Sequence, residues 1–294
     1  MSFTVIGNDN GFLPEAFVAT SLPLLPGQRA DILVDFSDRL VGDVLTLVNV
    51  GPDALYQTSS QPPANRFTTG LVMQFHVSVN DSNSTLRELS DYDEEAEDFS
   101  PEFHPLSPKH ITSPVSLRER REDLDSDGVD DDCYAVNEEI AQVRMEQGVD
   151  SFGRPVFIVN NGSFGDDVGL FFPTGRPVII DFINYTPDTQ PMHVHITDFK
   201  VCGRQSIAAG PESGWILPSG LDLGRRDTVA APSGQVTRVS ARFSVQGTFL
   251  LHSTILEQGT ISLICYLSLL CLPPLLLPLS KGEIKVSFQI CRGL

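Results

Sequence analysis

Residues 25–36 read Leu25-Pro26-Gly27-Gln28-Arg29-Ala30-Asp31-Ile32-Leu33-Val34-Asp35-Phe36. The stretch opens with Pro-Gly, a dipeptide typical of turns. The seven residues from Ala30 to Phe36 then alternate with the period of a strand that buries one face. This stretch therefore predicts a strand that the chain enters from a tight turn.

The same combination of short β-prone runs and turn residues recurs along the chain. We expect strands at residues 3–6, 30–36, 44–50 and 71–79, and again at 156–159, 178–183, 193–201, 236–243 and 248–251. The 21 Pro and 23 Gly fit many short strands better than helices, and no long segment shows the helical period. The prediction is an all-β chain of two units, with strands at the spacing of a β-sandwich.

An acidic segment separates the two units. The 294-residue chain has 38 acidic and 20 basic side chains and a net charge of -18. Residues 88–139 hold 18 of the acidic and four of the basic ones, so they contribute -14. Such a block is typical of a solvated linker. The excess of carboxylates also argues against nucleic acid as a partner, because phosphates require clustered Lys and Arg.

The five cysteines lie far apart at Cys133, Cys202, Cys265, Cys271 and Cys291. They form no CxxC pair, so the spacing predicts neither a disulfide framework nor a structural zinc site. The N-terminus lacks a basic region followed by an apolar stretch, so no secretory signal is visible and the compartment stays unassigned.

The last part of the chain differs in character. Residues 261–279 are uncharged and dominated by Leu, long enough to span a bilayer as a helix. Pro273, Pro274 and Pro278 argue against such a helix, because each removes a backbone hydrogen bond. The run shows neither the helical nor the strand period. We expect residues 261–294 to be an apolar tail foreign to the sandwich, from intron read-through or a frameshift, and a membrane anchor is the competing account.

Two histidines form the most informative motif of the chain. His193 and His195 lie two residues apart in an expected strand, so their side chains point to the same face and offer two imidazoles to metal ions. His252 follows about 60 residues later, at the end of another expected strand. The alternative is that these are ordinary exposed or buried strand histidines. His76 is more simply a strand residue than a ligand.

Together with other strings, these motifs resemble the laccase-like multicopper oxidases, and most closely the branch with spore-coat laccase, bilirubin oxidase and phenoxazinone synthase. The strings at residues 6–13, 25–36 and 73–77 look like the end of that family's second cupredoxin domain, and residues 150–155 like the start of its third. The resemblance covers residues 3–80 and 145–258.

The resemblance implies a fold of cupredoxin (plastocyanin-like) Greek-key β-sandwich domains. It places the C-terminal part of a second domain at residues 1–80, an acidic linker at 81–144, a third domain at 145–260 and the apolar tail at 261–294. It also implies copper as cofactor and an oxidoreductase activity in which a phenolic, aminophenol or tetrapyrrole donor is oxidised and O2 is reduced to water. Family members are often extracellular, periplasmic or attached to the spore coat.

Carried over position by position, the family's metal ligands are only partly present. In the trinuclear copper cluster, His193 matches the type 2 ligand, and His195 and His252 match type 3 ligands. Thr254 stands where the family has a further type 3 histidine. No histidine motif of the family's first domain precedes residue 193.

The type 1 copper site is lost entirely in this comparison. Gln190, Ser253 and Gln258 stand where the family has histidine, cysteine and histidine. A blue-copper site needs a cysteine thiolate and imidazoles, and a neutral amide or hydroxyl replaces neither. We therefore expect the chain to be inactive as an oxidase on its own.

A second candidate metal site lies in the acidic segment. Its alternating carboxylates resemble a DxDxDG calcium loop, with candidate ligands Asp123, Asp125, Asp127, the Val129 carbonyl and Asp131. The twelfth position lacks the glutamate of an EF-hand, so a bare acidic linker is an equal alternative.

The sequence thus predicts a multicopper-oxidase-like protein that retains part of a copper site. Two alternatives stay open. One is a non-catalytic, cupredoxin-like metal-binding protein whose acidic loop binds calcium. The other is a fragment or faulty gene model of an active oxidase.

Overall fold

The computed structural model describes residues 1–52, 63–78, 133, 140–149, 153, 155–160, 169–210, 213–255 and 266–272. Almost all regular structure in these ranges is β, as the alternating and turn-punctuated sequence predicts. A single turn of 3-10 helix, η4 (Gly220–Leu223), connects two strands of the C-terminal part. None of the helices within the described ranges is long and apolar enough to cross a membrane.

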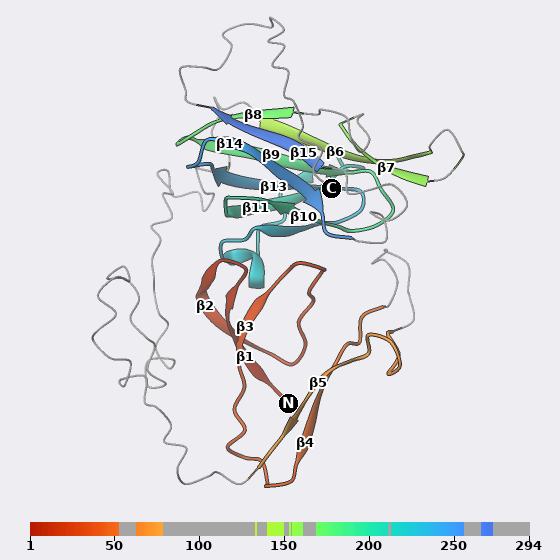
Figure 1. Cartoon of the computed structure of the whole chain (residues 1–294), viewed down its shortest axis with the longest axis vertical. Coiled ribbons are helices and arrows are strands. Elements are labelled where there is room, and N and C mark those ends of the chain that lie inside the picture. The colour runs from red at the N-terminus through yellow and green to blue at the C-terminus, as the bar shows by residue number, and fades with distance from the viewer. Residues whose placement is uncertain are drawn as a thin grey trace, which may run out of the picture.

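Two five-stranded sheets form the C-terminal part of the molecule (Figure 1). The first has the order β12 (Thr228–Ala231), β10 (Gln190–Val194), β14 (Gly247–Ser253), β15 (Tyr266–Leu272), β8 (Gly169–Pro173). The second has the order β11 (Phe199–Ser206), β13 (Gln235–Arg242), β9 (Pro177–Asn184), β6 (Ile140–Val149), β7 (Pro155–Val159). This is the β-sandwich that the sequence predicts.

Apolar side chains from both sheets form one core. Phe182 on β9, Met192 on β10 and Phe199 on β11 are completely buried. Phe172 and Phe243 stack with their ring centroids 5.0 Å apart. Burial of large aromatic and aliphatic side chains on facing strands is the main stabilising contribution to such a sandwich.

The N-terminal part consists of two smaller sheets. One has the order β2 (Gly11–Ala19), β1 (Phe3–Asn8), β3 (Ala30–Leu33), and the other pairs β4 (Val44–Val48) with β5 (Leu71–His76). The strand predicted at residues 30–36 is therefore present but ends at Leu33.

Contacts with η4 join the N-terminal sheet to the sandwich. Leu221 of η4 packs in a small buried cluster with Val5 and Leu13. The Asn8 side-chain amide donates to the Leu221 carbonyl over 2.7 Å. Next to it, the guanidinium of the buried Arg226 contacts the Asp9 carboxylate, with Nε and Oδ2 3.1 Å apart. These contacts bring the turn after β1 against the start of β12, where Thr228 pairs with His193 of β10.

Two sequence predictions are wrong in detail. The single strand expected at residues 193–201 is two strands, β10 and β11, which lie in different sheets. The chain reverses between them at Ile196, whose φ of 66° no alternation pattern reveals. The apolar run at residues 261–294 was expected to be foreign to the sandwich, but it contains β15, which pairs with β14 on one side and β8 on the other. The origin of this run and a membrane anchor stay predictions. The domain boundaries near residues 80, 145 and 260 stay predictions.

The structure also contains a disulfide that the spacing of the cysteines did not predict. Cys133 and Cys202 form a disulfide across 69 residues, so the expectation of no disulfide is wrong for this pair. Cys202 lies on β11, and both residues are buried. A pair so far apart in sequence leaves no spacing signal, since only the fold brings the two β-carbons together.

Removal of this disulfide is expected to lower the free energy of unfolding of the Cys133→Ser, Cys202→Ser variant by about 2–4 kcal/mol, because the cross-link restricts the unfolded chain. Urea unfolding of both proteins measures the loss. Dithiothreitol serves as the control, because it should destabilise the wild type and leave the variant unchanged. Equal unfolding midpoints for the wild type with and without reductant would contradict the prediction.

Candidate metal centre

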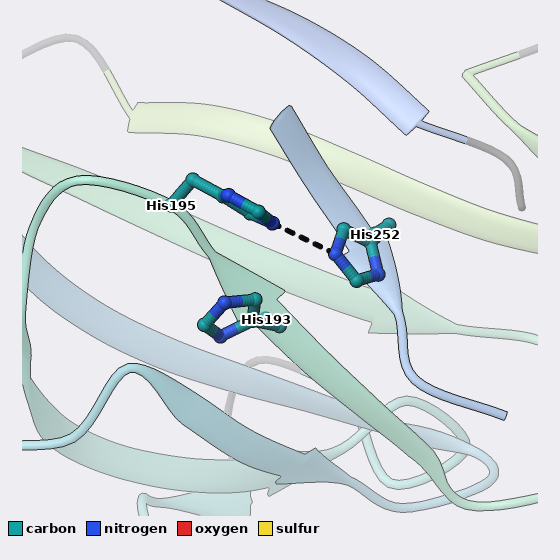
Figure 2. A group of neighbouring side chains, drawn as sticks. All are labelled: His193, His195 and His252. Carbon is teal, nitrogen blue, oxygen red and sulfur yellow. Dashed lines mark hydrogen bonds between the residues drawn. The ribbon is translucent and has the colours of Figure 1, made fainter. Parts of the chain in front are cut away.

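Strand pairing gathers the three predicted histidines. His193 on β10 lies directly opposite His252 on β14 and, on its other side, opposite Thr228 on β12. Residues that face each other across antiparallel strands share one face of the sheet. His195 follows β10 directly and lies two residues beyond His193, so its ring returns to that face (Figure 2). The sequence prediction that these three side chains lie together is supported by this geometry.

The three rings are close enough to share one ion. One ring nitrogen from each of His193, His195 and His252 lies within 4.8 Å of the others. Nε2 of His195 and Nε2 of His252 are 2.9 Å apart and hydrogen-bonded (Figure 2). Two imidazole nitrogens bound about 2.0 Å from one ion in tetrahedral geometry lie roughly 3.3 Å apart, so only a small opening of this pair is needed.

Hydrogen bonds to backbone carbonyls determine which ring nitrogen of His193 and of His252 carries the hydrogen and which keeps a lone pair. His193 Nδ1 lies 3.0 Å from the Asp227 carbonyl, and His252 Nδ1 lies 2.9 Å from the Ser253 carbonyl. A carbonyl only accepts, so each Nδ1 carries the hydrogen and donates it. Nε2 of a neutral ring then has its lone pair available for a metal. In the metal-free site, His195 Nε2–H donates to His252 Nε2.

Burial favours the neutral form of two of the rings. Desolvation lowers the pKa of His195 below its ordinary value of 6.5, and the neighbouring His193 and His252 lower it further. Desolvation also lowers the pKa of His252, with His193 adding to the shift and the Ser253 carbonyl opposing it. Only neutral imidazole binds a metal, so both shifts keep these rings available as ligands at neutral pH.

The donor set fits copper. Three neutral imidazoles suit copper or zinc, and in general nitrogen ligands bind Cu²⁺ more tightly than Zn²⁺. Within the parts of the chain that the structure describes, these histidines are the one group of three or more potential ligands close enough to hold an ion.

Asp227 and Arg29, which sequence reasoning missed, lie behind His193. The Asp227 carboxylate is 3.5 Å from His193 Nδ1, and Arg29 binds that carboxylate through both terminal nitrogens, at 2.8 and 2.7 Å. Burial opposes ionisation of Asp227, but hydrogen bonds from Arg29 and Thr228 outweigh it and hold the pKa of the carboxyl below its ordinary value. The two partners are 198 positions apart in the sequence and therefore form no motif, although Arg29 itself lies within a string that resembles the family.

A hydrogen-bonded pair occupies two of the type 1 positions. Ser253 Oγ donates to Gln190 Oε1 over 2.8 Å, and both side chains are buried in the sheet. Thr254, at a type 3 position, donates instead to the Pro26 carbonyl over 2.6 Å. Gln190 and Ser253 offer neither thiolate nor imidazole, so they do not fit a blue-copper ion. Thr254 likewise offers no imidazole at its type 3 position. Gln258 lies outside the described residues.

The predicted calcium ligands also lie outside the described residues. They are Asp123, Asp125, Asp127, Val129 and Asp131. Calcium binding by this segment therefore stays a prediction.

Comparison with known sequences and structures supports the resemblance seen in the motifs. The sequence model of the multicopper oxidase family matches residues 138–262. A laccase of Bacillus subtilis is 28% identical over 266 residues, covering 87% of this chain and 44% of the laccase. A laccase of Haloferax volcanii is 28% identical over 243 residues, covering 81% of this chain and 33% of that protein.

Solved structures show the same fold. The multicopper oxidase McoA of Aquifex aeolicus matches 92% of this chain and 50% of its own with a TM-score of 0.55 and 24% identity. A multicopper oxidase of Pediococcus acidilactici matches 93% of this chain and 44% of its own with a TM-score of 0.57 and 20% identity. The cupredoxin β-sandwich predicted from the sequence is confirmed. The chain spans less than half the length of the laccases it matches.

Proposed function

Because the chain is related to the laccase-like multicopper oxidases, whose cofactor is copper, we propose that it binds one copper ion through His193, His195 and His252. The convergence of the three ring nitrogens within 4.8 Å carries this proposal. The Nε2 lone pair of His252, which Nδ1–H directs towards the other two rings, and the lowered pKa values of His195 and His252 support it. Bound copper would supply a centre that gains and loses single electrons.

We further propose that this chain alone does not oxidise the phenolic, aminophenol or tetrapyrrole donors of the family. Electrons from such a donor enter through the type 1 site, and here Gln190 and Ser253 satisfy each other in a buried hydrogen bond. The protein part of the site has two roles that follow from the structure. The backbone carbonyls orient the rings, and the sheet shields one side of them from water.

Copper titration tests the binding site. We expect wild-type protein to bind one ion per chain and the His193→Ala, His195→Ala double variant to lose that site, because two of three ligands are removed. His76→Ala is the matched control: His76 is an exposed histidine on β5, and its loss should leave the isotherm unchanged. Metal titration in the presence of a competing chelator measures the affinities.

Copper ions bound by carboxylates of the acidic segment would add to the titration curve. Nitrogen hyperfine coupling in the electron paramagnetic resonance spectrum separates the two kinds of ion, because only imidazole-bound Cu²⁺ shows it. Identical isotherms and spectra for the wild type and the double variant would contradict the proposal.

A further inference from the structure

Asp227 lies where it can decide which nitrogen of His193 faces the metal. His193 Nδ1 is 3.0 Å from the Asp227 carbonyl and 3.0 Å from Thr228 Oγ1. The Thr228 hydroxyl in turn donates to Asp227 Oδ1 over 2.9 Å. Because the single hydroxyl hydrogen is directed at the carboxylate, Thr228 Oγ1 presents its lone pairs to His193. Both neighbours of Nδ1 are then acceptors.

We propose that Asp227 is a positioning residue of the histidine site: by accepting the Thr228 hydrogen, its carboxylate keeps that hydroxyl from donating to His193 Nδ1. Together with the backbone carbonyl of the same residue, it holds His193 as the tautomer with hydrogen on Nδ1 and a metal-binding lone pair on Nε2. This inference rests on the proposed copper site and concerns a residue outside its three ligands. Carboxylates behind ligating histidines commonly fix ring orientation in this way. Here the carboxylate acts mainly through the neighbouring hydroxyl.

Contacts from the distant N-terminal part fix Asp227 itself. Arg29 binds both carboxylate oxygens, and its backbone amide donates to Asp9 Oδ1 over 2.7 Å. Asp9 Oδ2 also accepts from the Thr228 amide over 3.4 Å. The Asp227 carboxylate is therefore held from two directions, and its side chain is only 16% exposed. The N-terminal sheet thus contributes to the site although it provides no ligand.

Replacement of Asp227 by alanine is the direct test. The Thr228 hydroxyl loses its carboxylate acceptor in this variant and can donate to His193 Nδ1 instead. The backbone carbonyl of residue 227 stays in place and still accepts from Nδ1–H, so the tautomer balance of the ring shifts towards Nε2–H, the form without a lone pair on the metal side. We expect Cu²⁺ affinity to fall by about 10- to 100-fold. Nitrogen-15 chemical shifts of the imidazole in metal-free protein should show a larger share of His193 in the Nε2–H form than in the wild type.

Three further variants separate positioning from general damage to the fold. The Asp227→Ala, Thr228→Val double variant removes the competing hydroxyl, so the Nδ1–H form and part of the affinity should return. Asp227→Asn keeps an oxygen that accepts from Thr228 and should retain the wild-type tautomer. If the alanine variant does not fold, an Nε2–H tautomer in Asp227→Asn would overturn the proposal. Asp181→Asn is the matched control, because Asp181 also binds an arginine through both oxygens but on β9, in the other sheet.

The outcomes distinguish the two proposals. A folded Asp227→Ala protein with the wild-type tautomer and a copper affinity within twofold of the wild type would overturn the role of Asp227. If wild-type protein binds no copper through its histidines, the proposed function fails. The tautomer measurement on metal-free protein then still decides whether Asp227 controls His193.

Discussion

Copper-loaded protein is expected to lack the intense visible absorption of a copper–thiolate centre. That absorption requires a cysteine sulfur bound to Cu²⁺, and Ser253 stands at the cysteine position of the family. Ser253 is moreover hydrogen-bonded to Gln190, at the position of a histidine ligand. A visible spectrum of the protein after anaerobic loading and reoxidation measures this, together with oxygen uptake in the presence of a phenolic donor. We expect neither a band nor uptake above that of free copper.

A designed variant provides the positive control. Gln190→His, Ser253→Cys places an imidazole and a thiol where two polar atoms now lie 2.8 Å apart. This variant is expected to gain copper–thiolate absorption under the same loading procedure. An intense band in the wild-type protein would show that a cysteine binds copper in this chain and that the type 1 comparison is wrong.

Replacement of Asp9 by alanine is expected to lower the free energy of unfolding by about 3–5 kcal/mol, because it leaves the guanidinium of Arg226 in the interior without one of its carboxylates. The side chains of Arg226 and Asp9 are 3% and 0% exposed. Arg226 Nη2 has no hydrogen-bond partner in the described part of the chain, and Asp222 alone would remain to balance the charge. Urea unfolding measures the change.

An exposed ion pair in the same part of the chain is the control. Asp38 contacts Arg39 at 3.0 Å, but the Asp38 side chain is 70% exposed. Asp38→Ala should therefore change stability by only about 0–1 kcal/mol. If the two variants were equally stable, the contact between Asp9 and Arg226 would not contribute to docking of the N-terminal sheet.

The alternation of apolar and polar residues predicted the strands that have one face in the core. β3 lies close to its expected position because it combines a period of two with β-branched residues, whereas β9 was found as a short run of apolar, β-branched residues that is buried on both faces. β6 was missed because it directly follows the acidic segment. Its two completely buried residues, Val143 and Met145, alternate with polar neighbours that look like a continuation of the linker. β15 was missed because a uniform Leu-rich run contains no alternation.

The site was predictable only where ligands form a short motif. His193 and His195 lie two residues apart, and His252 could be added because its surroundings resemble the same family. Asp227 and Arg29 form no motif, since the two residues meet only after the N-terminal sheet has docked beside β12. Residues that orient a ligand are selected by three-dimensional contact, so spacing along one sequence does not reveal them.

The place of β15 in its sheet affects how the protein folds during synthesis. β8 is an edge strand that pairs only with β15 in the described sheet, and the two strands are parallel. About 100 residues separate the two strands. Translation adds about 5–20 residues per second, so β15 is synthesised roughly 5–20 s after β8. During that interval the nascent chain exposes an unpaired strand edge, which can pair with other chains. Nascent chains that end before residue 266 should therefore depend on chaperones, and completed chains should be released from them.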